Sequence, residues 1–266
     1  MIFLKLGGSL ITFKDRANTA RGDVLDRLAA EIADARRADP LLEILVGHGS
    51  GSFGHSAASR HRTHLGGEDW VGLAEVWRSA NLLNRLVIDA LIGAGLPALS
   101  FPPSASARVR DGDIVELAVE PIRRAIEVRL LPVVQGDVAF DEHSGTTILS
   151  TERVFSYMAP RLQPQRVLLA GIDRGVYLDF PRNTKVAEEI RPTDLARLAI
   201  GGSSATDVTG GMADKVRHGL ALARSLPGLE VRVFSAEEPG ALREALLGGT
   251  PGTLLADDAA PSAEHR

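Results

Sequence analysis

Paired glycines beside lysines mark two places in the chain where an anionic ligand could bind. Lys5–Ser9 holds one pair after an apolar run, and Asp207–Lys215 holds another pair at the start of an amphipathic segment, with Lys215 one turn in. Glycine lets backbone N–H groups close on an anion, and a helix that starts there adds its positive end. Both segments therefore predict phosphate contacts, with a plain strand-to-helix turn as the alternative for the first. The chain has no Walker A motif, which excludes a P-loop NTPase.

A third glycine-rich segment, His48–His55, follows another apolar run. Its glycines match G-x-G-x-x-G, the dinucleotide fingerprint, but that fold needs a second strand ending in Asp or Glu about 20 residues later. The corresponding stretch, Arg60–Glu68, is polar and shows no strand pattern. We therefore favour a backbone nest for phosphate, with His55 donating to an anionic group; a solvated histidine at a helix start is the alternative.

Two further segments place acidic residues after apolar runs. Asp137 follows a run that ends in Gln-Gly, where open α/β sheets bind ligands, although a turn aspartate is equally consistent. Ala170–Tyr177 combines an acidic turn with an aromatic residue and is compatible with a base or ribose pocket, or with an Asx turn alone. His61 and His64 have the spacing of a metal pair, but no third ligand follows, so a solvated loop is favoured.

Lysine is rare in this chain, although Lys and Arg together number 30. A lysine retained where arginine serves as the general surface cation indicates a position that needs a compact ammonium. The lysines are Lys5, Lys14, Lys185 and Lys215.

The elements that must position these residues follow from the apolar pattern. Short runs rich in Val, Ile and Leu, each followed by a glycine turn and a segment of helical period, predict βα units on a mostly parallel sheet. We expect strands at Ile2–Leu6, Glu43–Val46, Ala98–Phe101, Leu131–Gln135, Val167–Ala170, Val231–Phe234 and Thr253–Leu255. We expect one helix capped by Asp23 and others at Asp69–Leu91, Pro121–Arg129, Glu152–Pro160, Thr193–Leu198, Met212–Leu226 and Pro239–Leu247.

Composition excludes several classes of protein. The 266 residues are 44% hydrophobic and 24% charged, with a net charge of −4, which is typical of a globular chain and gives no basic footprint for nucleic acid. The absence of cysteine excludes disulfides and thiolate chemistry. Since no stretch approaches about 20 apolar residues and the N-terminus does not resemble a signal peptide, we expect a cytoplasmic protein without a membrane partner.

The ordered set of glycine and lysine segments resembles the amino acid kinase superfamily over residues 1 to about 255. The superfamily shares Lys-x-Gly-Gly-Ser, a second glycine-rich loop, a Gly-Asp strand end and a late Thr-Gly-Gly-Met-x-x-Lys. Within it, the histidine of Gly51–His55 and Lys14 resemble the isopentenyl phosphate kinase branch. The resemblance implies an α/β fold, a three-layer αβα sandwich around a central, mostly parallel sheet. It also implies a homodimer.

The resemblance further implies ATP-dependent phosphorylation of isopentenyl phosphate to isopentenyl diphosphate, with Mg²⁺, in isoprene biosynthesis. We expect an acceptor-binding lobe at 1–163 and an ATP-binding lobe at 164–266, on one continuous sheet. The catalytic residues implied are Lys5 and Lys215 on the ATP phosphates, Lys14 on the phosphoryl group in flight and His55 on the acceptor phosphate. The other nucleotide-binding residues implied are Leu6, Gly7, Gly8, Ser9, Gly51, Asp173, Tyr177 and Gly211, and the acceptor-binding residues are Ser50 and Thr151. No metal-ligating side chain is assigned, and Asp137 is expected to orient the lysines.

The chain departs from the family pattern in two segments, and other members of the superfamily stay as alternatives. Ser150–Arg153 stands where the family often has Ser-Gly-Asp-Asp, and Ser50 replaces the usual third glycine of the second loop. The fosfomycin kinase group shares Gly-x-Phe-Gly-His and some similarity at Asp141–His143, while the Gly-Gly-Met-x-x-Lys segment favours the isopentenyl phosphate branch. Other small-molecule kinases and a nucleotide-sensing module without turnover are the remaining alternatives.

Overall fold

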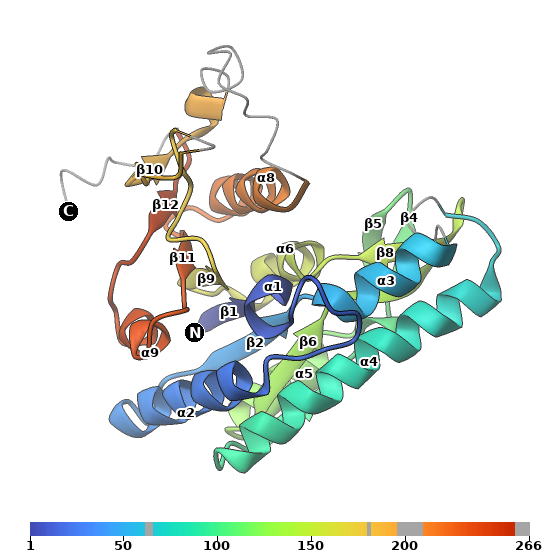
Figure 1. The fold of residues 1–266 in the computed structure, drawn as a ribbon, viewed down its shortest axis with the longest axis horizontal. Helices are drawn as coiled ribbons and strands as arrows, with labels where there is room; N and C mark the ends of the chain where they lie inside the picture. Colours follow the sequence, from blue (N-terminus) through green and yellow to red (C-terminus); the bar gives the residue numbers. More distant parts are fainter. Residues whose placement is uncertain (62–65, 180–181, 196–209, 259–266) are drawn as a thin grey trace.

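The computed structural model describes residues 1–61, 66–179, 182–195 and 210–258, and in them it confirms the three-layer α/β expectation. Eight strands form a central sheet in the order β10-β12-β11-β9-β1-β2-β6-β3, with helices on both faces (Figure 1). The strands are β1 (Ile2–Leu6), β2 (Ile44–His48), β3 (Ala98–Ser100), β6 (Leu131–Gln135), β9 (Arg166–Gly171), β10 (Glu189–Ile190), β11 (Glu230–Ser235) and β12 (Thr253–Leu255). The helices are α1 (Gly8–Ile11), α2 (Gly22–Ala38), α3 (Gly51–His61), α4 (Trp70–Gly93), α5 (Glu120–Glu127), α6 (Thr151–Leu162), α8 (Gly210–Ser225) and α9 (Ala241–Leu246), with a 3₁₀ turn, η2, at Pro103–Ala105.

Strand β1 lies in the middle of this sheet, between β2 and β9, and is parallel to both. The sheet is parallel from β11 through β9, β1, β2 and β6 to β3, while β12 runs antiparallel to β11. Because parallel strands end at one edge, the segments that follow β1, β2, β6 and β9 meet there. That edge contains most of the residues expected to do chemistry.

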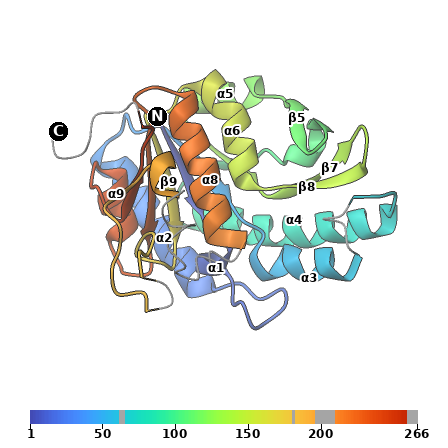
Figure 2. The same ribbon diagram turned by 90° about the horizontal axis from the view of Figure 1, so that it is seen from above.

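Side chains alternate along β1 between two buried apolar layers. Phe3 packs with residues of α5, α6 and α8, whereas Leu4 and Leu6 pack with α2, α4 and α9. Figure 2 shows α6 and α8 side by side over the first of these faces. The period-two alternation directs Lys5 to the same side as Phe3, toward α6 and α8.

A second sheet of four strands, in the order β5-β4-β7-β8, was not expected from the sequence. Its strands, β4 (Arg108–Arg110), β5 (Asp113–Glu116), β7 (Asp137–Asp141) and β8 (Gly145–Leu149), are short and largely polar, so they lack the apolar run that marks a strand.

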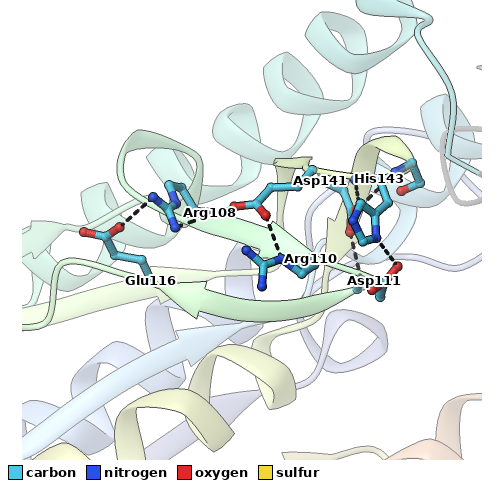
Figure 3. Close-up of polar contacts among 9 residues, drawn as sticks. Arg108, Arg110, Asp111, Glu116, Asp141 and His143 are labelled. Carbon is cyan, nitrogen blue, oxygen red and sulfur yellow. Dashed lines mark hydrogen bonds and ion pairs between the residues drawn. The ribbon is translucent and has the colours of Figure 1, made fainter.

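Charged pairs cross this small sheet, as Figure 3 shows. Arg108 pairs with Glu116 at 3.5 Å, and His143 lies 2.8 Å from Asp111. The carboxylate of Asp141 accepts hydrogen bonds from the backbone N–H groups of Gly112, His143 and Ser144, at 2.8 to 2.9 Å. Burial alone would raise the pKa of Asp141, but these donors outweigh it and lower the pKa well below its ordinary value. Ionised Asp141 therefore joins the two turns at this end of the sheet.

Other expectations about elements were incomplete or wrong. The residue at the N-cap of α2 is Arg21, and Asp23 lies in the first turn, where a carboxylate still complements the helix dipole. Helices α1 and α3 were missed because α1 is only four residues long and α3 has two glycines and one large apolar residue, so neither shows an apolar helical period. Residues 192–195 are helical, and the rest of the helix expected at Thr193–Leu198 lies outside the described residues. The sheet contains strands from both halves of the chain, while the division into acceptor and ATP lobes stays a prediction.

Among the helices that the structure describes, none combines the length and the apolar character needed to cross a membrane.

Gly47 of β2 is a point of close packing between the sheet and α6. A Cβ atom there would lie 2.5 Å from Cγ2 of Thr151 and 2.7 Å from Cζ of Phe155. Both residues are fully buried, so neither has space into which to move. The absence of a side chain at Gly47 therefore lets the first turn of α6 approach the centre of the sheet.

Gly47→Ala is expected to lower the free energy of unfolding by about 1–3 kcal/mol, since overpacking a well-packed core forces strained rearrangement. Urea denaturation measures the change. Gly93→Ala is the control, because a Cβ at that helix end meets nothing within 4 Å. Equal stabilities of the Gly47→Ala variant and the wild type would contradict this account of the packing.

Candidate active site

The glycine loops after β1 and β2 contact each other through their backbones. A Cβ atom on Gly8 would lie 2.5 Å from the backbone N of Gly51, and Gly51 itself has a φ of +49°. A Cβ atom on Gly51 would lie 2.3 Å from Oγ1 of Thr12. These contacts require glycine at both positions and bring the two loops together, backbone against backbone, where the two strands end.

The same loops are held by hydrogen bonds to neighbouring strands. The N–H of Gly7 donates to the carbonyl oxygen of Ala170 at 2.8 Å, and the N–H of Gly49 donates to that of Leu6 at 3.0 Å. Helix α3 begins at Gly51, directly after the second loop, so its positive end faces this edge. The prediction that both segments form phosphate-binding turns is consistent with this geometry and stays a prediction.

Lys5 and Glu152 form a buried ion pair at the centre of the site. Lys5 Nζ donates to Oε1 of Glu152, and the two residues are 7% and 8% exposed. Burial alone would raise the pKa of Glu152, but the charge and the hydrogen bond of Lys5 outweigh it, Lys215 adds to their effect, and the pKa is lowered. Glu152 therefore stays ionised, and α6 positions it by starting against β2.

Lys215 approaches the same carboxylate from α8. Its pKa is lowered, first by burial and then by repulsion from Lys5 and Lys14, while Glu152 and Asp173 act in the opposite direction. A Cβ atom on Gly171, the last residue of β9, would lie 3.6 Å from Nζ of Lys215. Three lysines and two carboxylates thus interact electrostatically at one end of the sheet, which makes an excess of positive charge there.

Lys14 lies on a loop between α1 and α2, which Figure 2 shows projecting past α1. A β-bridge between Thr12 and Ala20 closes the base of the loop, and Phe13 N–H donates to the carbonyl oxygen of Thr19 at 3.0 Å. The Lys14 side chain is exposed, and none of the described carboxylates forms a salt bridge with it. An exposed ammonium on a loop suits a group that meets a ligand from solvent.

Glu152 and His48 are site residues that the sequence analysis missed. His48 is fully buried beside Lys5, with Nε2 3.1 Å from Oδ1 of Asn84 and Nδ1 3.1 Å from the carbonyl oxygen of Gly49. Burial lowers the pKa of His48 more than these two hydrogen bonds raise it, and Lys5 lowers it further, so the ring is neutral at pH 7. The signal for Glu152 was its place in the segment that departs from the family's Ser-Gly-Asp-Asp.

The expectation that Asp137 orients the lysines was wrong. Its carboxylate accepts from the N–H groups of Ser104 and Val138 at 3.0 and 2.9 Å, and Glu152 takes the role beside Lys5. Burial raises the pKa of Asp137, and these hydrogen bonds only partly oppose the effect. Asp137 is therefore part of the junction between the two sheets.

Several other predicted residues lie at this edge in supporting roles. The Thr151 hydroxyl donates to the carbonyl oxygen of His48 at 2.7 Å, which joins α6 to β2. The carbonyl oxygen of Ser50 accepts from the N–H groups at the start of α3, and Tyr177 forms a β-bridge with Val186. Leu6 and Gly7 lie at the end of β1, and Ser9 lies in α1.

Parts of the predicted site lie outside the described residues. His55 lies in α3 and Gly211 in the first turn of α8, but their side-chain surroundings are not among the described features. His64 and the start of the Asp207–Lys215 segment also lie outside them.

His61 ends α3 and contacts the carboxylates of Asp69 and Glu75, which raise its pKa, with the hydrogen bond to Glu75 the largest cause. It joins α3 to α4.

Comparison with known proteins agrees with this geometry. Residues 1–235 match the family described as the amino acid kinase family, so the chain belongs to that family. Its resemblance to the isopentenyl phosphate kinase branch is also confirmed. The isopentenyl phosphate kinase of Methanothermobacter thermautotrophicus is 36% identical, covering 93% of this chain and 96% of that protein. That of Haloferax volcanii is 36% identical and covers 96% and 98%.

Solved structures show the same fold. An isopentenyl phosphate kinase structure covers 96% of this chain and 100% of its own, with a TM-score of 0.83 and 33% identity. A Giardia lamblia carbamate kinase bound to AMP-PNP covers 97% and 98%, with a TM-score of 0.74 and 15% identity, and is similar in fold alone. The site described above therefore belongs to a phosphotransferase fold.

Glu152→Gln is expected to lower the free energy of unfolding at pH 7 by about 3–5 kcal/mol, because the buried Lys5 ammonium loses its counterion. Because the folded state lowers the pKa of Glu152, its stabilisation is full above the ordinary value of 4.5 and is lost as pH falls through the folded value. Denaturant titrations of both proteins from pH 7 to pH 3 measure this. A difference in the free energy of unfolding between the wild type and Glu152→Gln that stays constant down to pH 3 would contradict the Lys5–Glu152 ion pair.

Proposed function

We propose that this chain transfers the γ-phosphoryl group of ATP to isopentenyl phosphate, giving isopentenyl diphosphate and ADP. The observation that carries the proposal is that Lys5, Lys14 and Lys215 interact electrostatically, with Lys215 beside Gly171 at the edge where β1, β2 and β9 end. Such a site supplies positive charge and backbone donors, which phosphoryl transfer needs most. The relatives that are similar over nearly the whole chain supply the acceptor's identity.

In the proposed reaction, an oxygen of the acceptor phosphate attacks the γ-phosphorus as the bond to the β,γ-bridging oxygen breaks. The acceptor is already an anion, so no side chain, His48 included, has to remove a proton. Lys5 and Lys215 would hold the ATP phosphates, and Lys14 would meet the charge on the group in transit. Catalysis then depends on alignment and on neutralised charge.

Mg²⁺ is proposed as the companion of ATP. Among the described residues, no group of three or more His, Cys, Asp or Glu side chains could cage an ion. Mg²⁺ commonly keeps several waters and binds through substrate phosphates with one or two carboxylates, and Asp173 beside Lys215 fits that limited role. When bound, the ion would neutralise charge on the β- and γ-phosphates.

The acceptor tail needs an apolar wall near α3. Leu73 and Val76 of α4 pack with Ala57 and Ala58 of α3 and with Val138 of β7, in a small cluster separate from the two main layers. Other apolar residues of α4 lie elsewhere: Leu83 and Val87 belong to the main core, and Trp77 is 45% exposed. We propose that the cluster between α3 and α4, beside the helix that contains His55, lies against the five-carbon tail.

The remaining proposals concern the two lobes of the enzyme, its oligomeric state and its location. We propose that residues 1–163 bind the acceptor and residues 164–266 bind ATP, with His55 on the acceptor phosphate and Ser50 and Thr151 close by. The protein is proposed to act as a homodimer in the cytoplasm. A sedimentation mass of one 28.3 kDa chain at micromolar concentration would contradict the dimer.

The purified enzyme is expected to release ADP with isopentenyl phosphate present and to show kcat/KM at least about 10²-fold higher for it than for fosfomycin, because the smaller, more polar molecule would fill an apolar site poorly. His55→Ala should raise KM for the acceptor much more than for ATP. A coupled ADP assay measures both. Better turnover of fosfomycin would replace the proposed acceptor, and nucleotide binding without turnover of any acceptor would indicate a sensor.

Lys14→Ala is expected to lower kcat about 10²- to 10³-fold with little change in either KM, because its charge is proposed to act mainly in the transition state. Steady-state kinetics with each substrate varied measures the split. Lys185→Ala is the control, since that side chain is exposed and the described hydrogen bonds of Lys185 are made by its backbone, with Leu178 and Asp179. Wild-type kcat in Lys14→Ala would end this role.

A further inference from the structure

Arg21 fastens the base of the Lys14 loop to a segment from the other end of the chain. Its Nη1 donates to Oε1 of Glu237 at 2.7 Å and to the carbonyl oxygen of Leu10 at 3.1 Å, while Nη2 donates to Oε2 of Glu237 at 3.3 Å. Its backbone N–H donates to the carbonyl oxygen of Ile11 at 2.9 Å. One residue therefore binds α1, the start of α2 and Glu237 together, and its two-pronged geometry is one that lysine cannot reproduce.

The loop needs such a fastening because its lysine is repelled by the site. Lys14 opposes the charge on Lys215, so the like charges favour movement of the loop away from the sheet edge. The described restraints on the loop include the Thr12–Ala20 bridge, the hydrogen bond from Phe13 to Thr19 and the Arg16 guanidinium over the Phe13 ring. At its base, Oγ1 of Thr12 also accepts from the N–H of Ser52 at 3.1 Å. An exposed loop with few restraints places a charge poorly unless its base is fixed.

Glu237 belongs to the segment that also borders Lys215. It follows β11, and the N–H of Ala236, one residue earlier, donates to the carbonyl oxygen of Gly171 at 2.9 Å. Gly171 is the residue whose Cβ position lies 3.6 Å from Nζ of Lys215. The ion pair thus connects the loop of one lysine to the strand end beside another, across 216 residues of sequence.

We propose that Arg21, through its ion pair with Glu237, is a positioning residue that sets the place of Lys14 relative to Lys215 during phosphoryl transfer. The inference rests on the proposed function for its kinetic consequence. Arg21 touches neither substrate in this account, and it acts by limiting the positions that the Lys14 ammonium can reach. A displacement of about 1 Å at a reacting group can cost about 10²-fold in rate.

The test compares Arg21→Ala with Arg27→Ala. Arg27 is a matched control because it lies in α2, close to the N-cap residue Arg21, and its side chain is equally exposed at 22%. It donates to Glu31 and to the carbonyl oxygens of Ala236 and Glu238, so it binds the segment on either side of Glu237 without contacting the Lys14 loop. Arg21→Ala should lower kcat about 10- to 100-fold and leave KM for ATP within about threefold, while Arg27→Ala should keep wild-type kcat. Equal kcat in the two variants would overturn the proposal.

A double variant separates positioning from general loss of structure. In a Lys14→Ala background, Arg21→Ala should lower kcat less than twofold further, because the group that it positions is gone. A loss that multiplies fully with that of Lys14→Ala would overturn the proposal. If Arg21→Ala does not fold, Glu237→Gln keeps the bond from Arg21 to Leu10, removes the charge partner, and should show the same split between kcat and KM.

A readout without substrate keeps this inference distinct from the proposed function. Hydrogen exchange should be faster at the amides of Phe13 and Arg21 in Arg21→Ala and Glu237→Gln, and unchanged there in Arg27→Ala. If exchange is faster but the enzyme does not phosphorylate isopentenyl phosphate, the positioning role of Arg21 in the loop is supported and the proposed acceptor is wrong. If exchange is unchanged while isopentenyl phosphate is turned over normally, the Arg21 proposal is overturned and the proposed acceptor stands.

Discussion

Repulsion among the lysine ammonium groups is the constraint on which the rest of this structure depends. Burial lowers the pKa of Lys215 most, and repulsion from Lys5 and Lys14 lowers it further. A site of this kind is unfavourable without a ligand, because like charges come together where water is scarce. Glu152 offsets part of that cost through its ion pair with Lys5, and polyphosphate would offset the rest. The charge that makes the empty site costly is the charge that would hold ATP.

Packing between the elements of the fold holds these cations near one another. β1 lies at the centre of the sheet and directs Lys5 toward α6, whose first turn reaches the sheet because Gly47 has no side chain. Glycines at 8 and 51 let two loops pack backbone against backbone at the same edge. Lys215 arrives from α8, and Lys14 from a loop that Arg21 fastens to the segment after β11. Each cation comes from a different element, so its position is set by packing between elements.

Local pattern was enough to predict the parts of the molecule that are locally determined. Ile2–Leu6, Leu131–Gln135 and Thr253–Leu255 are strands with the expected bounds, because apolar runs bounded by turns have few alternatives. The strands β7 and β8 were missed because their apolar runs are only three and two residues long, Val138–Phe140 and Ile148–Leu149. Lys5 was readable from its glycine neighbours, whereas its partner Glu152 lies 147 residues away. Contacts over such separations depend on the folded topology, so the apolar periodicity of the sequence does not predict them.

The small number of lysines makes the central claim directly measurable. In protein labelled with ¹³C at the lysine Cε positions, four resonances titrate, and Lys215→Arg identifies one of them. We expect Lys215 to titrate below its ordinary value of 10.5, Glu152→Gln to lower that pKa further, and saturating ADP to raise it, because bound phosphate favours the charged form. A Lys215 that titrates at 10.5 and responds neither to Glu152→Gln nor to ADP would contradict the claim that these charges form one phosphate-binding site.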